Sequence, residues 1–162
     1  MTLIKSISGV RGIVNDGLDY AIIEKFVFSF LLLQNNGPIL IARDGRSHGL
    51  EFSEKLCKAL SAIGRDVINC GIIPTPTAQF IVENNQYSGG IVITASHNPT
   101  NWNGLKFIDS DGCFISPEKY KKLLSVMEDQ KYINQKYDNA GKIKNYNKEA
   151  IDKHLNNITN LS

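Results

Sequence analysis

The sequence contains few of the residues and runs that mark specialised protein classes. Its three cysteines lie far apart, are odd in number and form no CxxC pair, so neither a disulfide framework nor a cysteine-based zinc site is indicated. The longest apolar run, residues 26–33, is too short to cross a bilayer, and the first residues carry no long apolar stretch. We therefore expect a protein of the reducing cytoplasm that is neither secreted nor held in a membrane.

The sequence has no marked excess of charge of one sign, and it lacks the common nucleotide-binding motifs. Eighteen Lys and Arg residues against sixteen Asp and Glu give a formal net charge of +2, without a run of five like charges, so nothing indicates nucleic-acid binding. No repeat of 20–50 residues is present, which excludes solenoids and propellers. GxxxxGK[ST] and GxGxxG loops are absent, and the absence of a GxSxG elbow argues against acyl transfer.

The length of the chain and the pattern of its apolar residues predict one layered α/β domain. The chain of 162 residues, 42% hydrophobic, can bury a sizeable core. Helical periodicity and capping residues predict helices over residues 19–33, 50–63, 77–84 and 117–128. Short apolar runs predict strands over residues 39–42, 66–71 and 89–94, and residues 105–115 predict an antiparallel pair joined by an Asp-Gly turn.

This alternation predicts a three-layer α/β/α domain over residues 1–130, with a mixed, mostly parallel sheet. Residues 131–162 change in character, becoming rich in Asn and Lys with few apolar positions. We interpret them as a linker or the truncated start of a further domain, with a helical stretch near the end.

Four polar segments of this domain could meet at one edge of the sheet. Ligands of open α/β sheets bind off the carboxyl ends of the parallel strands, where successive loops converge. The candidates are SGVRG at 8–12, RDGRS at 43–47, GIIPTPT at 71–77 and TASHNPTNWNGLK at 94–106. Three of them supply Arg or Lys, and glycines let backbone N–H groups approach an anion closely, so phosphate is the expected ligand.

Ser96 is the candidate nucleophile or phosphate carrier in the last of these segments. Serine alone is common in loops, but its neighbours here favour chemistry. Small residues precede it, Asn98 begins a turn with the following proline, and Lys106 comes ten residues after the serine, just beyond a glycine that would let the chain double back. A serine held near a base and a cation is suited to phosphate transfer.

The motifs TASHNP and NGLK, preceded in order and spacing by SGVRG and RDGRS, resemble the first domain of the α-D-phosphohexomutases. This superfamily comprises phosphoglucomutase, phosphomannomutase and phosphoglucosamine mutase, and the resemblance covers about residues 4–128. It implies interconversion of hexose 1-phosphate and hexose 6-phosphate through a bisphosphate intermediate. Ser96 would be phosphorylated in the resting enzyme, would donate its phosphoryl group to the sugar, and would take back the other phosphate.

The resemblance also assigns roles to the cations around this serine. It implies that Lys106 and Arg11 lie beside the phosphoserine and the reacting hydroxyl. His97 and Asn98 would orient the serine loop, and general acid or base work by His97 is possible.

The sequence leaves two roles open for the two arginines of the RDGRS segment. Arg43 and Arg46 either contact phosphate or brace the site in a salt-bridged turn with Asp44. In both cases they would lie close to the serine loop.

The sequence departs from the family in two respects. KSI at 5–7 replaces the Phe-Gly-Thr that usually precedes SGxRG, and the Asp-Gly-Asp metal loop, the sugar-selecting loop and the loop that holds the second phosphate are missing. The family's Mg²⁺ would be bound by the phosphate of Ser96 and by three aspartates outside this sequence, so we do not expect this chain alone to bind it.

The leading hypothesis is therefore the amino-terminal, phosphoserine-bearing domain of a phosphohexomutase. Its partners would be a hexose phosphate and the remaining domains of the same polypeptide, with no nucleic acid and no membrane. We expect the isolated chain to be inactive. The alternative is a stand-alone module of the same fold that binds a sugar phosphate or another anion, or serves as an interaction domain, without catalysis.

Overall fold

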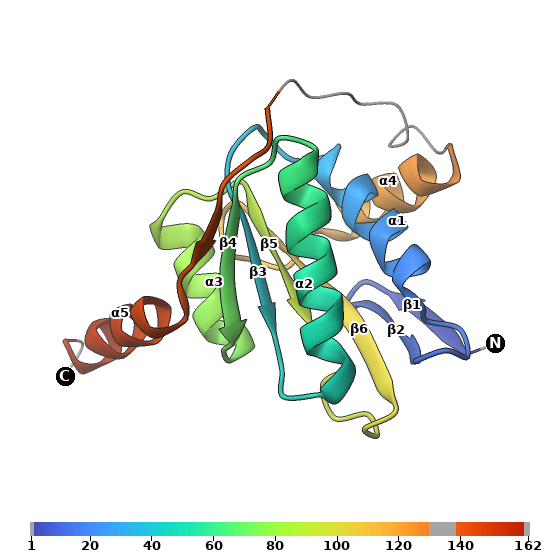
Figure 1. Cartoon of the computed structure of the whole chain (residues 1–162), viewed down its shortest axis with the longest axis horizontal. Helices are drawn as coiled ribbons and strands as arrows, with labels where there is room; N and C mark the ends of the chain where they lie inside the picture. Colours follow the sequence, from blue (N-terminus) through green and yellow to red (C-terminus); the bar gives the residue numbers. More distant parts are fainter. Residues whose placement is uncertain (1, 130–138, 161–162) are drawn as a thin grey trace.

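The computed structural model describes residues 2–129 and 139–160. Within these residues the chain forms five helices and seven strands (Figure 1). The strands are β1 (Leu3–Ser6), β2 (Gly9–Ile13), β3 (Ile39–Arg43), β4 (Val67–Ile72), β5 (Gly89–Ile93), β6 (Trp102–Asp109) and β7 (Ile143–Asn145). The helices are α1 (Tyr20–Leu31), α2 (Ser47–Ala62), α3 (Thr75–Asn84), α4 (Pro117–Glu128) and α5 (Asn147–Thr159).

Local signals place the ends of these helices. The carboxylate of Asp19 accepts a hydrogen bond from the backbone N–H of Ile22 and caps α1, and Ser116 caps α4 in the same way. Gly64 follows α2 with a positive φ of 77°, as a helix-terminating glycine does. The helices predicted to begin near residues 19 and 117 and to end near residue 63 are confirmed. None of the described helices is both long enough and apolar enough to span a membrane.

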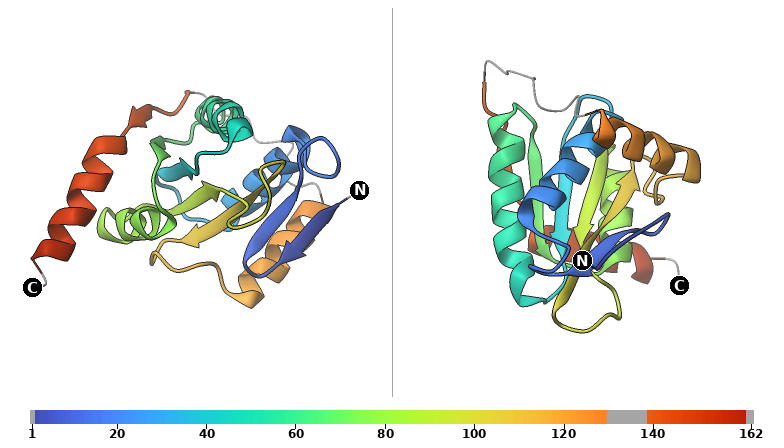
Figure 2. Two further views of the ribbon diagram at one scale, coloured as in Figure 1. Left: turned by 90° about the horizontal axis from the view of Figure 1, so that it is seen from below. Right: turned by 90° about the vertical axis from the view of Figure 1, so that its right-hand side faces the viewer.

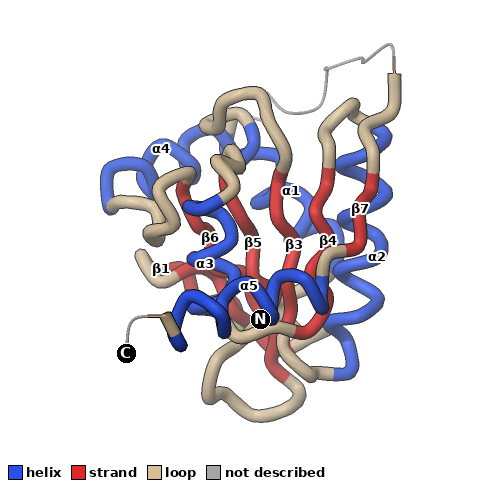
Figure 3. Tube along the Cα trace, turned by 90° about the vertical axis from the view of Figure 1, so that its left-hand side faces the viewer, coloured by secondary structure: helices blue, strands red, loops and turns tan. Residues whose placement is uncertain are grey.

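The sheet is mixed, with the strand order β1-β2-β6-β5-β3-β4-β7 (Figure 3). The predicted mixed sheet is confirmed, but the parallel share is smaller than expected. Among the described strands, the pairs β3–β4, β3–β5 and β4–β7 are parallel, and the other three pairs are antiparallel. The antiparallel half comes from β6, which returns beside β5, and from the β1–β2 hairpin, which extends the sheet beyond β6.

Helices cover both faces of the sheet, which confirms the α/β/α layers. Side chains of α1, α2 and α4 form one apolar core with the sheet, and side chains of α3 and α5 form a second. Figure 2 shows α2 and α3 on opposite sides of the strands. In the first core, Phe107 of β6 packs against Phe30 of α1 with ring centroids 5.1 Å apart.

Two predictions of local structure are wrong at the first and last thirds of the domain. The segment at residues 8–12 is not a free loop, because Gly9–Ile13 pairs with both β1 and β6. The second strand of the hairpin predicted at residues 105–115 is reduced to a single bridge between Ile108 and Phe114. The segment at residues 8–12 was misjudged because its pairing with β6 depends on residues about ninety positions away rather than on its own residue pattern.

Part of the tail joins the sheet. Residues 143–145 pair in parallel with β4, and the Asn147 side chain donates to the carbonyls of Cys70 and Ile72. Helix α5 then packs on α3, where the Thr77 hydroxyl lies 2.9 Å from Nδ1 of His154. The predicted helical stretch is thus present, whereas residues 131–138 of the predicted linker lie outside the described residues.

The crossovers create a switch point beside β3. The chain leaves β3 through α2 to reach β4 on one side, and then returns through α3, on the other face, to β5 on the opposite side of β3. The loops after β3 and β5 therefore leave the sheet next to each other. Such a point is where open α/β sheets bind ligands.

Candidate active site

A cavity of about 220 Å³ opens at the carboxyl end of β5. Its wall combines three segments that are distant in the sequence: the start of β2, the serine loop at residues 94–101, and the middle of β6. The lining residues are Ser8, Gly9, Val10, Arg11, Thr94, Ala95, Ser96, His97, Leu105 and Lys106. The candidate serine, histidine and two of the candidate cations therefore share one cavity.

Ser96 presents an exposed side chain from a backbone of left-handed conformation. Its φ is +57°, which costs an L-residue other than glycine about 1–2 kcal/mol. The residues before it are buried and fix the start of the loop, and Ser96 and His97 themselves are exposed. This turn holds the Ser96 side chain clear of β5, so its hydroxyl is open to a ligand.

Two cations reach this cavity from neighbouring strands. Arg11 of β2 donates to the side-chain oxygen of Asn98 at 3.1 Å and to the hydroxyl of Ser8 at 3.5 Å. The ammonium group of Lys106 lies 5.4 Å from the centre of the Phe114 ring, which is exposed. Neither cation has an acidic partner in these contacts, so the charge of both remains to attract an anion.

Two glycines allow β2 and β6 to approach closely enough to place these cations. A Cβ atom on Gly9 would lie 2.0 Å from the carbonyl oxygen of Leu105, and one on Gly104 would lie 2.2 Å from the carbonyl oxygen of Val10. Gly104 was expected to let the chain double back, but it lies within β6 opposite Arg11. Its role is to admit the neighbouring backbone.

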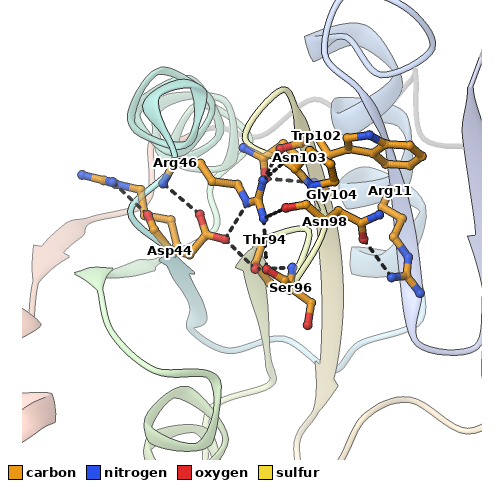
Figure 4. Close-up of polar contacts among 11 residues, drawn as sticks. Arg11, Asp44, Arg46, Thr94, Ser96, Asn98, Trp102, Asn103 and Gly104 are labelled. Carbon is orange, nitrogen blue, oxygen red and sulfur yellow. Dashed lines mark hydrogen bonds and ion pairs between the residues drawn. The ribbon is translucent and has the colours of Figure 1, made fainter.

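Arg46 holds the serine loop through its backbone. The guanidinium group donates to the carbonyls of Ser96 (3.0 Å), Asn98 (2.6 Å), Trp102 (3.0 Å) and Pro99 (Figure 4). Its Nε donates to the carboxylate of Asp44 at 3.0 Å, and the Arg46 side chain is only 11% exposed. The salt-bridged turn that was one of the two interpretations of this segment is therefore present.

The other arginine of this segment faces its own turn. Arg43, the last residue of β3, donates to the carbonyl of Asp44 at 3.1 Å, and it is not among the residues that line the cavity. Asn98 reaches the cavity region only through Arg11, to which it offers its side-chain oxygen. Asn98 lies within the serine loop itself, and for Arg43 the sequence left open whether it contacts phosphate or braces the turn.

Asp44 and Thr94 are functional candidates that the sequence reasoning did not assign. The hydroxyl of Thr94 donates to the carboxylate of Asp44 at 2.6 Å and accepts the backbone N–H of Ser96 at 2.9 Å. Both are polar residues at the carboxyl ends of buried neighbouring strands. That position, rather than any motif, is the signal that could have found them.

The described residues do not by themselves make a metal site. No group of three or more His, Cys, Asp or Glu side chains converges within residues 2–129 and 139–160. The carboxylate of Asp44, which lies beside the serine loop, is already hydrogen-bonded to Arg46 and Thr94. This donor set therefore does not fit Mg²⁺, which prefers several oxygen ligands in octahedral geometry.

Comparison with known proteins gives a consistent match. The sequence model described as "Phosphoglucomutase/phosphomannomutase, alpha/beta/alpha domain I" matches residues 3–134. The phosphoglucosamine mutase of Prochlorococcus marinus subsp. pastoris is 36% identical over 154 residues, which are 94% of this chain and 32% of that protein. The phosphoglucosamine mutase of Nautilia profundicola is 41% identical over 117 residues, covering 71% of this chain and 27% of its own length.

Solved structures agree with this match. A phosphoglucomutase/phosphomannomutase family protein from Burkholderia thailandensis superimposes with a TM-score of 0.75 and 26% identity, covering 94% of this chain and 35% of that chain. A phosphomannomutase described as putative, from Thermus thermophilus, has the same fold with a TM-score of 0.76. This chain thus spans about a third of the length of the relatives that it matches.

Proposed function

This chain belongs to the phosphoglucomutase/phosphomannomutase family, of which it contains the α/β/α domain I, and from this premise we propose that it is the phosphoserine-bearing part of a phosphohexomutase. Ser96 carries the phosphoryl group that is exchanged between hexose 1-phosphate and hexose 6-phosphate. The observation that supports this proposal is the cavity in which the exposed Ser96 meets two cations, Arg11 and Lys106, from separate strands.

The proposed transfer needs little covalent chemistry from the protein. The phosphorus–oxygen bond to Ser96 breaks while a new bond forms to a sugar hydroxyl, which gives up its proton. Ser96 Oγ leaves as the alkoxide and takes up a proton in turn. Positioning and neutralisation of charge on the transferring oxygens account for most of the rate enhancement in such reactions.

The chain's own residues supply the local part of that work. Lys106 and Arg11 are placed to attract the three outer phosphate oxygens, and the hydrogen bond from Arg11 to Asn98 keeps the guanidinium beside the loop. His97 lines the same cavity and is exposed, so it could take the sugar proton and return it. Neutralising cations on two strands also stabilise the dianionic phosphoserine between turnovers.

We propose that the remaining domains of a longer protein supply the other Mg²⁺ ligands and the residues that bind the sugar. Bound Mg²⁺ neutralises charge on a transferring phosphoryl group. In this chain a phosphate on Ser96 would contact it, together with ligands from the remaining domains of a longer protein. The isolated chain is therefore expected to turn over hexose phosphates many orders of magnitude more slowly than a complete mutase, because each strong electrostatic contact is worth roughly 100- to 1000-fold.

The carrier assignment is tested by loading the chain with phosphate. The protein is incubated with glucose 1,6-bisphosphate, and its intact mass is followed alongside Ser96→Ala and the control Ser110→Ala, which changes an exposed turn serine after β6. We expect the wild type and Ser110→Ala to gain one phosphate and Ser96→Ala to gain none. Phosphate that persists in Ser96→Ala would refute the assignment.

A second measurement separates the catalytic proposal from a purely binding module. A module that only binds sugar phosphate would bind glucose 1,6-bisphosphate by calorimetry without ever acquiring covalent phosphate. Catalytic chemistry is supported if phosphate loaded on Ser96 is transferred to added glucose 1-phosphate. Because the isolated chain is expected to react slowly, the incubation is prolonged, and glucose 1,6-bisphosphate that binds the wild type without ever forming covalent phosphate would favour the binding module.

A further inference from the structure

We propose that Asp44, Arg46 and Thr94 act as positioning residues that hold the Ser96 backbone in its left-handed conformation, and that Arg46 binds the loop instead of the phosphate. This inference rests on the proposed function for its effect on phosphate transfer. The hydrogen bonds that carry it stand independently of that function. It decides between the two interpretations that the sequence left open for Arg46.

Every N–H donor of the Arg46 guanidinium is already used within the protein, so none is left to bind a ligand. A guanidinium group has five N–H donors in a fixed planar fork: one on Nε and two on each terminal nitrogen. In this structure Nε donates to Asp44, one terminal nitrogen donates to two carbonyls, and the other donates to two more. All five donors therefore have acceptors within the protein, and a phosphate could be bound only by breaking one of these bonds.

The bonds converge on the peptide groups that flank the serine. Arg46 donates to the carbonyl of Ser96, and the hydroxyl of Thr94 accepts the backbone N–H of the same residue. Both polar backbone groups of Ser96 are thus fixed, while its side chain points away from the guanidinium (Figure 4). An unfavourable φ persists only where the surroundings over-determine it, and these two bonds do so.

The carboxylate of Asp44 contacts both Thr94 and Arg46, the two residues that fix the Ser96 backbone. Its carboxylate accepts from the Thr94 hydroxyl at 2.6 Å, from Arg46 Nε at 3.0 Å, and from the Arg46 backbone N–H at 3.0 Å. Because its hydrogen is committed to Asp44, the Thr94 hydroxyl turns a lone pair to the Ser96 N–H. The loop after β3 thereby fixes the loop after β5 across the switch point.

If the proposal is correct, removing these hydrogen bonds slows phosphate transfer, although the cations that line the cavity are unchanged. Small displacements of a reacting atom from its productive geometry can cost about 100-fold in rate. Arg46→Lys discriminates between the two roles, because lysine keeps the charge but cannot supply five donors in a planar fork. A phosphate-binding role would leave Arg46→Lys nearly as active as the wild type, whereas the positioning role makes it nearly as slow as Arg46→Ala.

The first arm of the test measures loading of Ser96 from glucose 1,6-bisphosphate in the full 162-residue chain. We expect the rates of Arg46→Ala and Arg46→Lys to fall by about 100-fold. Thr94→Val should show a similar loss, and Thr94→Ser, which keeps the hydroxyl, should recover most of the rate. A wild-type rate in Arg46→Lys, or no recovery in Thr94→Ser, would overturn the proposal.

The second arm needs no phosphate chemistry and separates this inference from the proposed function. Hydrogen exchange of the peptide covering residues 95–102 is measured on the unphosphorylated chain. Exchange in Arg46→Lys and Thr94→Val should be at least tenfold faster than in the wild type if opening of this loop follows the loss of its bonds. Unchanged exchange would overturn the inference, even if the wild type loads phosphate normally. Faster exchange in a wild type that never loads phosphate would support it while refuting the function.

Arg65 offers a matched control. It also donates from one terminal nitrogen to two backbone carbonyls, those of Asn35 and Gly37, but in a different loop. Arg65→Lys should leave both the loading rate and the exchange of residues 95–102 unchanged. If Arg65→Lys altered them as strongly as Arg46→Lys, general destabilisation would explain the result and the positioning role would be refuted.

Discussion

Replacing Gly104 by alanine tests how the candidate site depends on the close contact of β2 with β6. The added Cβ would lie 2.2 Å from the carbonyl oxygen of Val10 and 2.9 Å from the Cα of Arg11. Ordinary contacts lie near 3.5 Å, so β2 must move by roughly 1 Å. The whole β1–β2 hairpin is affected, because β6 is the strand that joins it to the rest of the sheet.

The expected cost follows from two opposing effects. Overpacking of this kind destabilises by about 1–3 kcal/mol. Alanine also restricts the unfolded chain more than glycine does. This stabilises the folded state by about 0.4–1 kcal/mol where the backbone conformation suits alanine. We therefore expect Gly104→Ala to lower the free energy of unfolding by about 1–2 kcal/mol and the Tm by about 2–4 °C per kcal/mol.

Urea unfolding followed by circular dichroism measures this change. The control is Gly45→Ala, because a Cβ on Gly45 meets nothing within 4 Å and its φ is not in the left-handed region. We expect that control to be neutral or slightly stabilising. A Gly104→Ala protein with a wild-type urea midpoint would show that β2 and β6 do not need this approach, and the account of how Arg11 is placed would fail.

Three further predictions concern the core and the thiols. Phe107→Ala should cost about 3–5 kcal/mol in urea unfolding, since this 2%-exposed ring packs against two phenylalanines of α1; a loss below 1 kcal/mol would contradict that packing. Burial raises the pKa of Cys57 to about 11 and that of Cys70 to about 12, from 9.0. A folded-state pKa above the unfolded value gives stability that is complete below pH 9 and lost as pH rises toward 12, so the urea midpoint should fall across that range. At pH 8, a thiol-specific disulfide reagent should modify the exposed Cys113 rapidly and the other two thiols only on unfolding; three fast thiols would contradict their burial.

The sequence by itself determined most of the helices and strands and the position of the candidate serine loop. Helical periodicity and caps such as Asp19 and Ser116 are set by neighbours within four residues, and the structure places helices there. The serine loop could likewise be located from its own residues, because a polar, turn-forming segment directly after a buried strand must leave the sheet at that strand's end. Ser96 was located in this way, whereas Arg11 and Lys106 were assigned by the resemblance to the phosphohexomutases and lie within β2 and β6.

Only the tertiary structure decided which groups those residues meet. Arg46 and Arg43 stand three positions apart in one polar segment. Arg46 binds four carbonyls of the serine loop and the start of β6, about fifty residues away, whereas Arg43 binds its own turn. The same holds for β7, whose three exposed residues join the sheet because β4 offers a free edge. Hydrogen bonds of this kind depend on the distance between backbones after folding, which no local pattern of residues encodes.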